Sequence, residues 1–318
     1  MGDSMRIVFM GMTGEFSRIP FQALLDARAN VAGLIIPRPS ADRDGPRWLD
    51  PSSSSPSGLP LLSSPVAPNV VHLATSAGIA ILEVGSLSDP RSLAALDSLA
   101  PDLICAACFP WLLPPAWLEC PSLGCLNLHP SLLPAYRGPA PLFWQFRAGE
   151  QPTGVTLHFM DEGADTGDIV SQVEVSFPDG ITGLEADRLT AEAGARLVME
   201  ALAPPHPLAS PPDRTFPGGR GGGLPRRPQP EAGASYQSRP SRSDLAIPIS
   251  WTARRAFNFI RGAGEWGPFE IVVGGGRFRV SEALTYSPDA RLGQPYRREG
   301  GELWVEFEEG VVRMTATL

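Results

Sequence analysis

The sequence predicts an α/β catalytic domain with a parallel sheet, followed by a small β-barrel domain. Near the start, two apolar strand-like segments at residues 5–10 and 31–36 flank a helical segment at 20–28. This βαβ order is typical of a parallel sheet with helices on both faces. After a stretch rich in proline and glycine, short strand-like segments alternate with glycine-containing turns, as in small barrels. A chain of 318 residues can bury two cores, so we expect a catalytic domain over 1–203, a linker over 204–235 and a barrel over 236–318.

The remaining elements follow from local signals. Residues 37–68 are dominated by proline, serine and aspartate and predict a long surface loop. Asp89 is a suitable N-cap for a helix at 90–99. Apolar patterns predict further helices at 139–149, 184–202 and 251–261. They predict strands at 79–83, 103–107, 124–129, 154–160 and 169–175, and barrel strands at 269–273, 277–280, 303–307 and 311–314.

Composition excludes several classes of function. All 26 basic residues are arginine, so neither Schiff-base chemistry on lysine nor a phosphate-loop lysine is available. Gly11 and Gly14 lack the spacing of a dinucleotide-binding fingerprint. A net charge of −8 does not favour general binding to nucleic acid. The apolar run at 7–12 is too short for a signal peptide, and no run is long enough to span a membrane. We therefore expect a cytoplasmic protein, and a monomer.

The four cysteines do not predict a metal site. Cys105 and Cys108 have the spacing of half a zinc site, but they fall in a predicted strand or at its end. Residues three apart on a strand face opposite sides, and no second ligand pair completes a tetrahedral set. We interpret these two, with Cys120 and Cys125, as buried structural thiols and expect no metal.

A polar pair stands at the end of the strand predicted at 124–129. Asn127 and His129 alternate with Leu126 and Leu128, so they share one face while the leucines face a core. Polar residues at the carboxyl end of a strand are where α/β enzymes place their sites. Each residue alone could equally cap a turn or end a strand, but together they predict a site.

A carboxylate for this pair is predicted in the glycine-rich loop at residues 161–168. Asp165 lies between Gly163 and Gly167, which allow a tight loop, and Asp161 and Asp168 remain rivals on spacing alone. Such a trio suits acyl transfer to an amine. Amide and imidazole N–H groups can stabilise an oxyanion, and a histidine oriented by a carboxylate can transfer the proton of the amine.

Residues 124–168 resemble the 10-formyltetrahydrofolate-dependent formyltransferases. The similarity lies in Asn127-Leu128-His129-Pro130-Ser131-Leu132-Leu133-Pro134, in Tyr136-Arg137-Gly138, in Thr153-Gly154-Val155-Thr156 and in Asp165-x-Gly167-Asp168. The resemblance implies a Rossmann-like formyltransferase domain that uses 10-formyltetrahydrofolate as co-substrate, with Asn127, His129 and Asp165 as the catalytic trio. It also implies which residues bind the folate. Two segments would hold its pterin largely by backbone groups, through Phe109, Trp111, Leu112, Leu113, Asp161, Gly163 and Gly167, and a third loop would shape the site, through Ser131, Leu132, Leu133 and Pro134.

The resemblance extends to both ends of the chain and bears on the acceptor amine. Residues 5–25, 228–236 and 249–261 resemble the start, linker and OB-like C-terminal barrel of methionyl-tRNA formyltransferases, which implies charged initiator tRNA as partner and a role in translation initiation. Glycinamide-ribonucleotide formyltransferases lack such a tail. Arginines in the loop at 37–68 are offset by aspartates, which keeps a small amine such as an amino sugar-nucleotide as the alternative acceptor. The third reading is a binding module for folate or RNA without catalysis.

Overall fold

The fold is described here from a computed structural model, which covers residues 5–38, 45–49, 68–203 and 224–317. By their contacts the residues group into two compact units. The first comprises Met1–Ala135, Val155–Val173 and Thr190–Ala234, and the second Tyr136–Gly154, Glu174–Leu189 and Ser235–Leu318. Most of the loop predicted at 37–68 and of the linker predicted at 204–235 falls outside the described residues. The predicted domain limits therefore stay a prediction.

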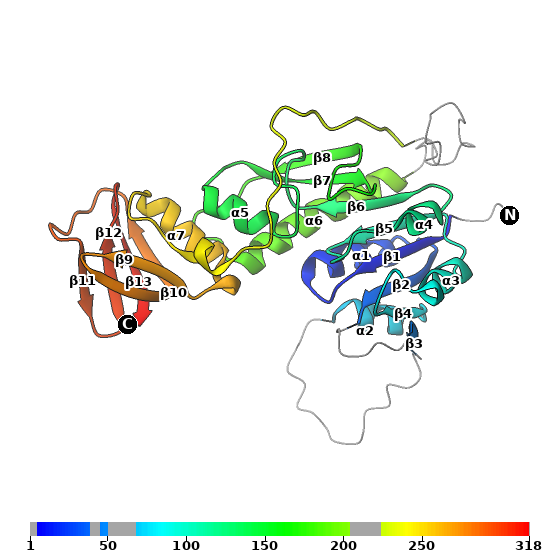
Figure 1. Cartoon of the computed structure of the whole chain (residues 1–318), viewed down its shortest axis with the longest axis horizontal. Helices are drawn as coiled ribbons and strands as arrows, with labels where there is room; N and C mark the ends of the chain where they lie inside the picture. Colours follow the sequence, from blue (N-terminus) through cyan, green and yellow to red (C-terminus); the bar gives the residue numbers. More distant parts are fainter. Residues whose placement is uncertain (1–4, 39–44, 50–67, 204–223, 318) are drawn as a thin grey trace, which may run out of the picture. The chain divides into compact units, whose positions relative to one another are not determined.

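An eight-stranded sheet forms the centre of the N-terminal part (Figure 1). Its strands lie in the order β3-β4-β2-β1-β5-β6-β7-β8. Four neighbouring pairs are parallel: β4 with β2, β2 with β1, β1 with β5, and β5 with β6. Two pairs are antiparallel: β3 with β4, and β7 with β6. The strands are β1 (Ile7–Gly11), β2 (Val31–Pro37), β3 (Arg47–Leu49), β4 (Ile81–Val84), β5 (Leu103–Ala107), β6 (Cys125–His129), β7 (Thr153–Phe159) and β8 (Ile169–Val175).

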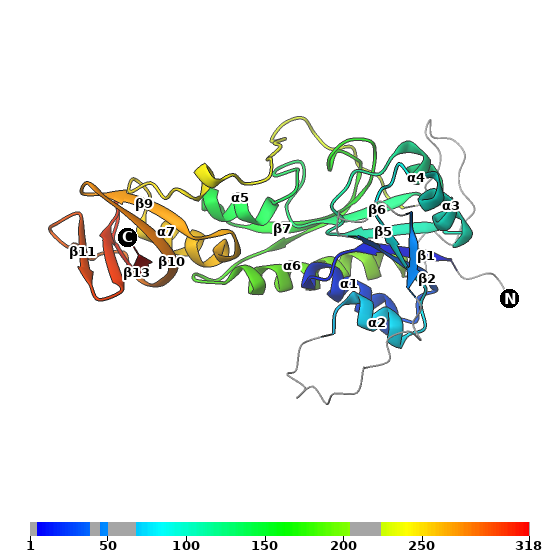
Figure 2. The ribbon, with the colours of Figure 1, turned by 60° about the horizontal axis from the view of Figure 1, so that its bottom comes forward.

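Helices cover both faces of this sheet, as the βαβ pattern predicts (Figure 2). On one face Phe9 of β1 packs on Phe21 of α1, with 5.1 Å between the ring centroids. On the other face Val8 and Met10 share a buried cluster with residues of α3 and α4. The helices of the N-terminal part are α1 (Glu15–Asp26), α2 (Val70–Ser76), α3 (Pro90–Ser98), α4 (Pro115–Glu119) and α6 (Gly183–Leu202), whereas α5 (Pro141–Ala148) belongs to the second unit. The predicted α/β class is confirmed.

Several element limits differ from the prediction. Helix α1 begins at Glu15, before Pro20, because its buried stripe already starts at Phe16 and the proline fits on that stripe. β3 lies within the stretch predicted as loop, and α2 and α4 were not predicted. Helix α2 has seven residues and α4 has five, so each is too short for its apolar residues to show a helical period in the sequence. Asp89 does cap α3, because its carboxylate accepts a hydrogen bond from the Arg91 N–H.

A five-stranded antiparallel sheet forms a half-barrel in the C-terminal part, where a small barrel was predicted. The strand order is β11-β12-β13-β10-β9. Phe259 of helix α7 (Ala253–Gly262) packs into its core against Phe143, Trp251 and Phe269, with centroids 5.0–5.5 Å apart. The strands are β9 (Phe269–Val273), β10 (Gly276–Ser287), β11 (Tyr296–Glu299), β12 (Glu302–Glu306) and β13 (Val311–Thr317), with short 3-10 helices η2 (Arg242–Leu245) and η3 (Gly264–Trp266).

Asp179 joins three segments of the second unit. Its carboxylate accepts hydrogen bonds from Arg254 Nε at 2.9 Å, Asn258 Nδ2 at 2.9 Å and the Tyr286 hydroxyl at 2.8 Å. Burial raises the pKa of Asp179, but the hydrogen bonds from Asn258, Tyr286 and Arg254 outweigh it, so its pKa lies below the ordinary value. A carboxylate whose pKa is lower in the folded than in the unfolded state stabilises the fold above the unfolded value near pH 4.

Asp179→Asn is therefore expected to lower the free energy of unfolding by about 1–3 kcal/mol at pH 7, the usual cost of losing charged hydrogen bonds. The difference from the unmodified protein should shrink as the pH falls through the lowered pKa, because the protonated Asp179 has already lost the same interaction. Urea unfolding at pH 7 and pH 3 measures both values, with the exposed Asp289→Asn as a charge-matched control. An equal loss at both pH values would contradict the role of the ionised carboxylate.

No helix among the described residues is long and apolar enough to cross a membrane.

Candidate active site

Strand β6 places Asn127 and His129 on one face of the sheet. Leu128, on the opposite face, lies beneath Gly194 of α6, where an added Cβ would meet the leucine side chain at 3.0 Å. His129 is 4% exposed and Asn127 is half-buried. The alternation predicted from the sequence is thus what the structure has. Because β6 is flanked by the parallel strand β5 and the antiparallel strand β7, the pair stands inside the sheet and not at its margin.

The loop at residues 161–168, which we call the Asp165 loop, connects β7 to β8. Asp161 stabilises it from within, because its Oδ1 accepts hydrogen bonds from the Gly163 N–H at 3.0 Å and the Thr166 hydroxyl at 2.7 Å. At Gly167 an added Cβ would meet the Phe159 carbonyl oxygen at 2.0 Å, so only glycine fits at this position. Asp165 itself has a left-handed backbone, with φ of 57°.

The structure brings the predicted trio together. The Oδ1 atom of Asp165 lies 3.4 Å from His129 Nδ1 and 3.4 Å from Asn127 Nδ2. The Asp165 side chain is 17% exposed and that of His129 is 5% exposed, so water has little access to their contact. Of the two rivals, Asp161 is used within the loop, and Asp168 acts electrostatically on Arg226. Asp165 is the one whose carboxylate faces the imidazole of His129 at 3.4 Å.

His158 on β7 is a member of the site that the sequence analysis missed. It is 2% exposed and lies opposite Asn127 in the antiparallel pairing of β6 and β7. Its Nδ1 lies 2.7 Å from the Phe159 carbonyl oxygen, and a carbonyl only accepts, so Nδ1 carries the hydrogen. In the neutral ring Nε2 then accepts from the Asn127 amide at 3.1 Å. The same Nε2 lies 3.6 Å from Asp165 Oδ1.

Buried hydrogen bonds hold the turn after β6. The Thr156 hydroxyl donates to the Ser131 carbonyl at 2.7 Å and accepts from the Leu133 N–H at 3.1 Å. Gln172 Nε2 donates to the Leu133 carbonyl at 2.8 Å and to the Thr156 hydroxyl at 2.9 Å. The Ser131 hydroxyl donates to the Ala135 carbonyl at 2.7 Å. Side chains of β7 and β8, with Ser131, thus stabilise the shape of this turn, in which Leu132 and Pro134 are half-buried.

The predicted folate contacts after β5 divide into two kinds. Phe109 and Trp111 pack edge to face, with centroids 5.5 Å apart, and both are half-buried. Leu112 is 57% exposed, whereas Leu113 is 2% exposed and belongs to the core beneath the sheet. Leu113 can therefore contact a ligand only through its backbone. Folate binding by this segment stays a prediction.

The cysteines only partly match the sequence analysis. Cys105 and Cys125 are buried, as predicted, but Cys108 is exposed and Cys120 is half-buried. Burial raises the pKa of the Cys105 thiol to about 12 and that of Cys125 further still, so neither is a nucleophile near neutral pH. Cys108 lies just past the end of β5, with φ of 57°, which turns it out of the strand. Across the described ranges no three His, Cys, Asp or Glu side chains form a group that could hold a metal ion.

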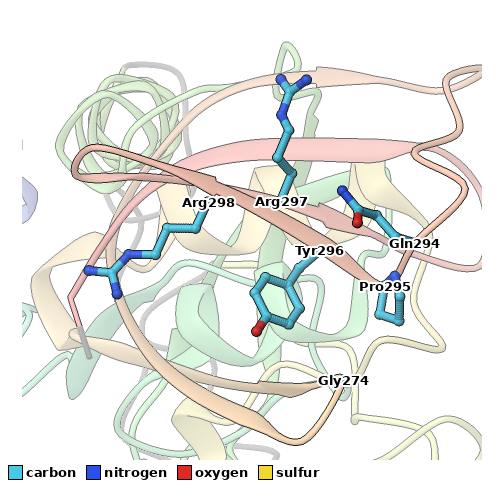
Figure 3. Close-up of a pocket in the computed structure, with 6 residues that line it drawn as sticks. All are labelled: Gly274, Gln294, Pro295, Tyr296, Arg297 and Arg298. Atoms are coloured by element: carbon cyan, nitrogen blue, oxygen red, sulfur yellow. The ribbon is translucent and has the colours of Figure 1, made fainter.

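A shallow cavity of about 450 Å³ lies on β11 of the half-barrel (Figure 3). Arg297 points away from Tyr296 and Arg298, as the alternation of a strand requires, and its guanidinium lies 4.4 Å from the centre of the Trp304 ring. The cavity is lined by Gly274, Gln294, Pro295, Tyr296, Arg297 and Arg298. None of the site residues predicted from the sequence is among them.

Comparisons with known proteins bear on the family of this chain. The formyl transferase family model matches residues 53–202, which include β6, β7 and the Asp165 loop. Methionyl-tRNA formyltransferase of Synechococcus sp. (strain JA-3-3Ab) is 39% identical over 201 residues, which cover 62% of this chain and 57% of that protein. The protein of the same name from Syntrophus aciditrophicus is 40% identical, and the match spans 59% of its length. These two alignments thus span less than two thirds of the relatives.

Solved structures share the fold over the whole chain. A methionyl-tRNA formyltransferase from Clostridium thermocellum has a TM-score of 0.54 at 14% identity, covering 98% of this chain and 100% of that one. The sugar 3N-formyl transferase WlaRD has a TM-score of 0.63 at 15% identity, covering 99% and 98%. Identities this low show the fold alone.

A longer alignment decides the family. Methionyl-tRNA formyltransferase of Marinobacter nauticus is 30% identical over 314 residues, which cover 98% of this chain and 91% of that protein. The α/β sheet, the half-barrel and the aligned length agree, and the chain therefore belongs to the methionyl-tRNA formyltransferase family of formyl transferases.

Proposed function

We propose that the protein transfers the formyl group of 10-formyltetrahydrofolate to the amino group of methionyl-tRNA. One observation carries the chemistry: the Asp165 carboxylate lies 3.4 Å from both Asn127 and His129 in a site with little access to water. The choice of methionyl-tRNA as acceptor is supported by the relatives, since the Synechococcus and Marinobacter nauticus proteins are both methionyl-tRNA formyltransferases.

Within the trio, Asn127 would stabilise the oxyanion, and His129 with Asp165 would transfer the proton. As the amine attacks, negative charge develops on the formyl oxygen, and the Asn127 amide N–H can donate to it. The Asp165 carboxylate faces His129 Nδ1 and favours the ring tautomer with hydrogen at that atom. Nε2 is then the nitrogen that accepts the proton of the amine. Once protonated, the imidazolium is stabilised by Asp165 and can donate from Nε2 to the charged oxygen. As the intermediate collapses, the bond between the formyl carbon and the folate nitrogen breaks, and that nitrogen takes the proton from Nε2, so tetrahydrofolate leaves.

The segments predicted to hold the folate suit a ligand bound mainly by backbone groups. Asp161 directs its carboxylate into its own loop, and Ser131 bonds to its own turn. Leu112, which is 57% exposed beside Trp111, offers apolar surface for a ring system. When bound, the folate supplies the formyl group, and no residue of this chain need form a covalent bond to it.

An acceptor assay tests the proposal. The purified full-length protein is incubated with 10-formyltetrahydrofolate and either methionyl-initiator tRNA or dTDP-linked amino sugars, and formylated product is measured by mass spectrometry. We expect product on methionyl-tRNA and none on the sugars, with KM for tRNA rising steeply between 50 and 200 mM salt as phosphate contacts weaken. Uncharged initiator tRNA is the control, since it lacks the amine.

Each other result has its own meaning. Formylation of amino sugars without formylation of methionyl-tRNA would assign the alternative acceptor. Folate binding by equilibrium dialysis, without formylation of any amine, would support the binding module instead.

A further inference from the structure

Residues 224–230, which we call the crossing segment, pair with the start of β8, directly after the Asp165 loop (yellow in Figure 1). The backbones of Arg227 and Ile169 exchange two hydrogen bonds, of 2.8 and 2.9 Å. The guanidinium of Arg226 lies 3.5 Å from the centre of the Phe159 ring. The segment is thus fixed both to the strand before the loop and to the strand after it.

Gln229 of the crossing segment binds the Asp165 loop directly. Its Nε2 donates to the Asp165 carbonyl at 2.8 Å and to the Gly167 carbonyl at 2.7 Å. A side-chain amide has two N–H bonds, so one half-buried group satisfies two carbonyls on either side of Thr166. This contact fixes the loop from outside, whereas Asp161 stabilises it from within.

Asp165 depends on such support because of its backbone. Its φ of 57° is in the left-handed region, which is unfavourable for a residue with a Cβ, although aspartate enters it more often than most residues. Residues held in this region persist when the surrounding structure determines them. If the carbonyl of Asp165 were released, the peptide could relax, and the carboxylate would move relative to its partners on β6.

We propose that Gln229 is a positioning residue that holds the Asp165 carboxylate at His129 and Asn127; the inference rests on the function proposed above. Asp165 Oδ1 already lies 3.4 Å from each partner, so a small displacement separates it from both. Misplacement of a catalytic group by about 1 Å can cost 100-fold in rate. The contribution of Gln229 therefore passes through Asp165 and not through substrate binding.

Gln229→Glu is the variant of choice because it keeps the shape and replaces the donating nitrogen with an oxygen. Two carbonyls would then face a carboxylate, so the loop should shift. We expect kcat to fall about 10- to 100-fold, with KM for both substrates changed less than about threefold. Glu231→Ala, at an exposed position of the same part of the chain, is the matched control and should leave kcat within about twofold.

A double-mutant cycle with Asp165→Asn separates positioning from a general structural role. If Gln229 acts through Asp165, Gln229→Glu should lower single-turnover rates less than about twofold further in the Asp165→Asn background. Multiplicative effects of the two substitutions would overturn the proposal.

Hydrogen exchange tests the same contact without any activity. In Gln229→Glu, peptides covering 160–168 should exchange faster, while peptides covering 124–130 should not. If the loop loosens but the unmodified protein formylates no acceptor, the proposed function fails and the structural contact stands. If exchange in the loop is unchanged, the positioning role is wrong, whatever the activity.

Discussion

His129→Asn is expected to lower kcat by about 10²- to 10⁴-fold, the usual contribution of a positioned acid–base group. Asparagine retains an amide near the Asp165 carboxylate but cannot take a proton from the amine near neutral pH. KM for either substrate should change less than about threefold, because the imidazole acts as the bond forms. Steady-state kinetics with methionyl-tRNA and 10-formyltetrahydrofolate measure both parameters.

Two controls make the result for His129 specific. His72→Asn replaces an exposed histidine of α2 and should leave kcat unchanged. Asp165→Asn should lower kcat too, and the double variant should be little worse than His129→Asn alone, because residues that act as a unit are not additive. A folded His129→Asn protein that keeps more than a tenth of kcat would falsify the proton-transfer role.

The sequence was sufficient for the part of the site that lies on one strand. Alternation along residues 124–129 places Asn127 and His129 on a common face, and the structure has them there. The choice among the aspartates was different. The flanking glycines favoured Asp165, but spacing alone left Asp161 and Asp168 as rivals, and the family resemblance also implied Asp165. The physical distinction is that Asp161 is consumed by hydrogen bonds within its own loop, which no pattern of residue types displays.

The residues that were missed depend on contacts remote in sequence. His158 reaches Asn127 because β6 and β7 are antiparallel with Asn127 opposite His158, and the sequence analysis assumed a parallel sheet. Gln229 lies in a stretch predicted to be a linker, since proline and glycine surround it. Its side chain nevertheless donates two hydrogen bonds to the Asp165 loop. Composition describes how a segment can fold by itself and not what it packs against.

In the half-barrel, too, local sequence patterns were insufficient to predict two of the strands. β11 was missed because Tyr296–Glu299 is polar, as the edge strand of a sheet often is. β10 was predicted as a four-residue strand but spans Gly276–Ser287, with register shifts in its pairing with β13. A shift interrupts the alternation of inward and outward residues, so the apolar pattern ends before the strand does.

Asn127→Ala is expected to lower kcat by about 10²- to 10³-fold, which is the usual cost of removing one oxyanion donor. The structure sharpens this expectation through His158. Its Nε2 accepts one N–H of the Asn127 amide at 3.1 Å, and the second N–H faces Asp165 Oδ1 at 3.4 Å, so the amide nitrogen is held in a fixed orientation and the second N–H is the one that would turn to the oxyanion. That geometry is prepared before the reaction, as stabilisation of an oxyanion requires.

His158→Phe should therefore reproduce part of the Asn127→Ala effect, because the phenyl ring fills the buried space but accepts no hydrogen bond. We expect a loss of about tenfold in kcat, and little further loss when His158→Phe is added to Asn127→Ala. Stopped single-turnover assays at saturating substrate measure these rates, and thermal unfolding checks that each variant is folded. A change confined to KM in Asn127→Ala would instead place the amide in substrate binding, since only a group that acts on the transition state lowers kcat at saturation.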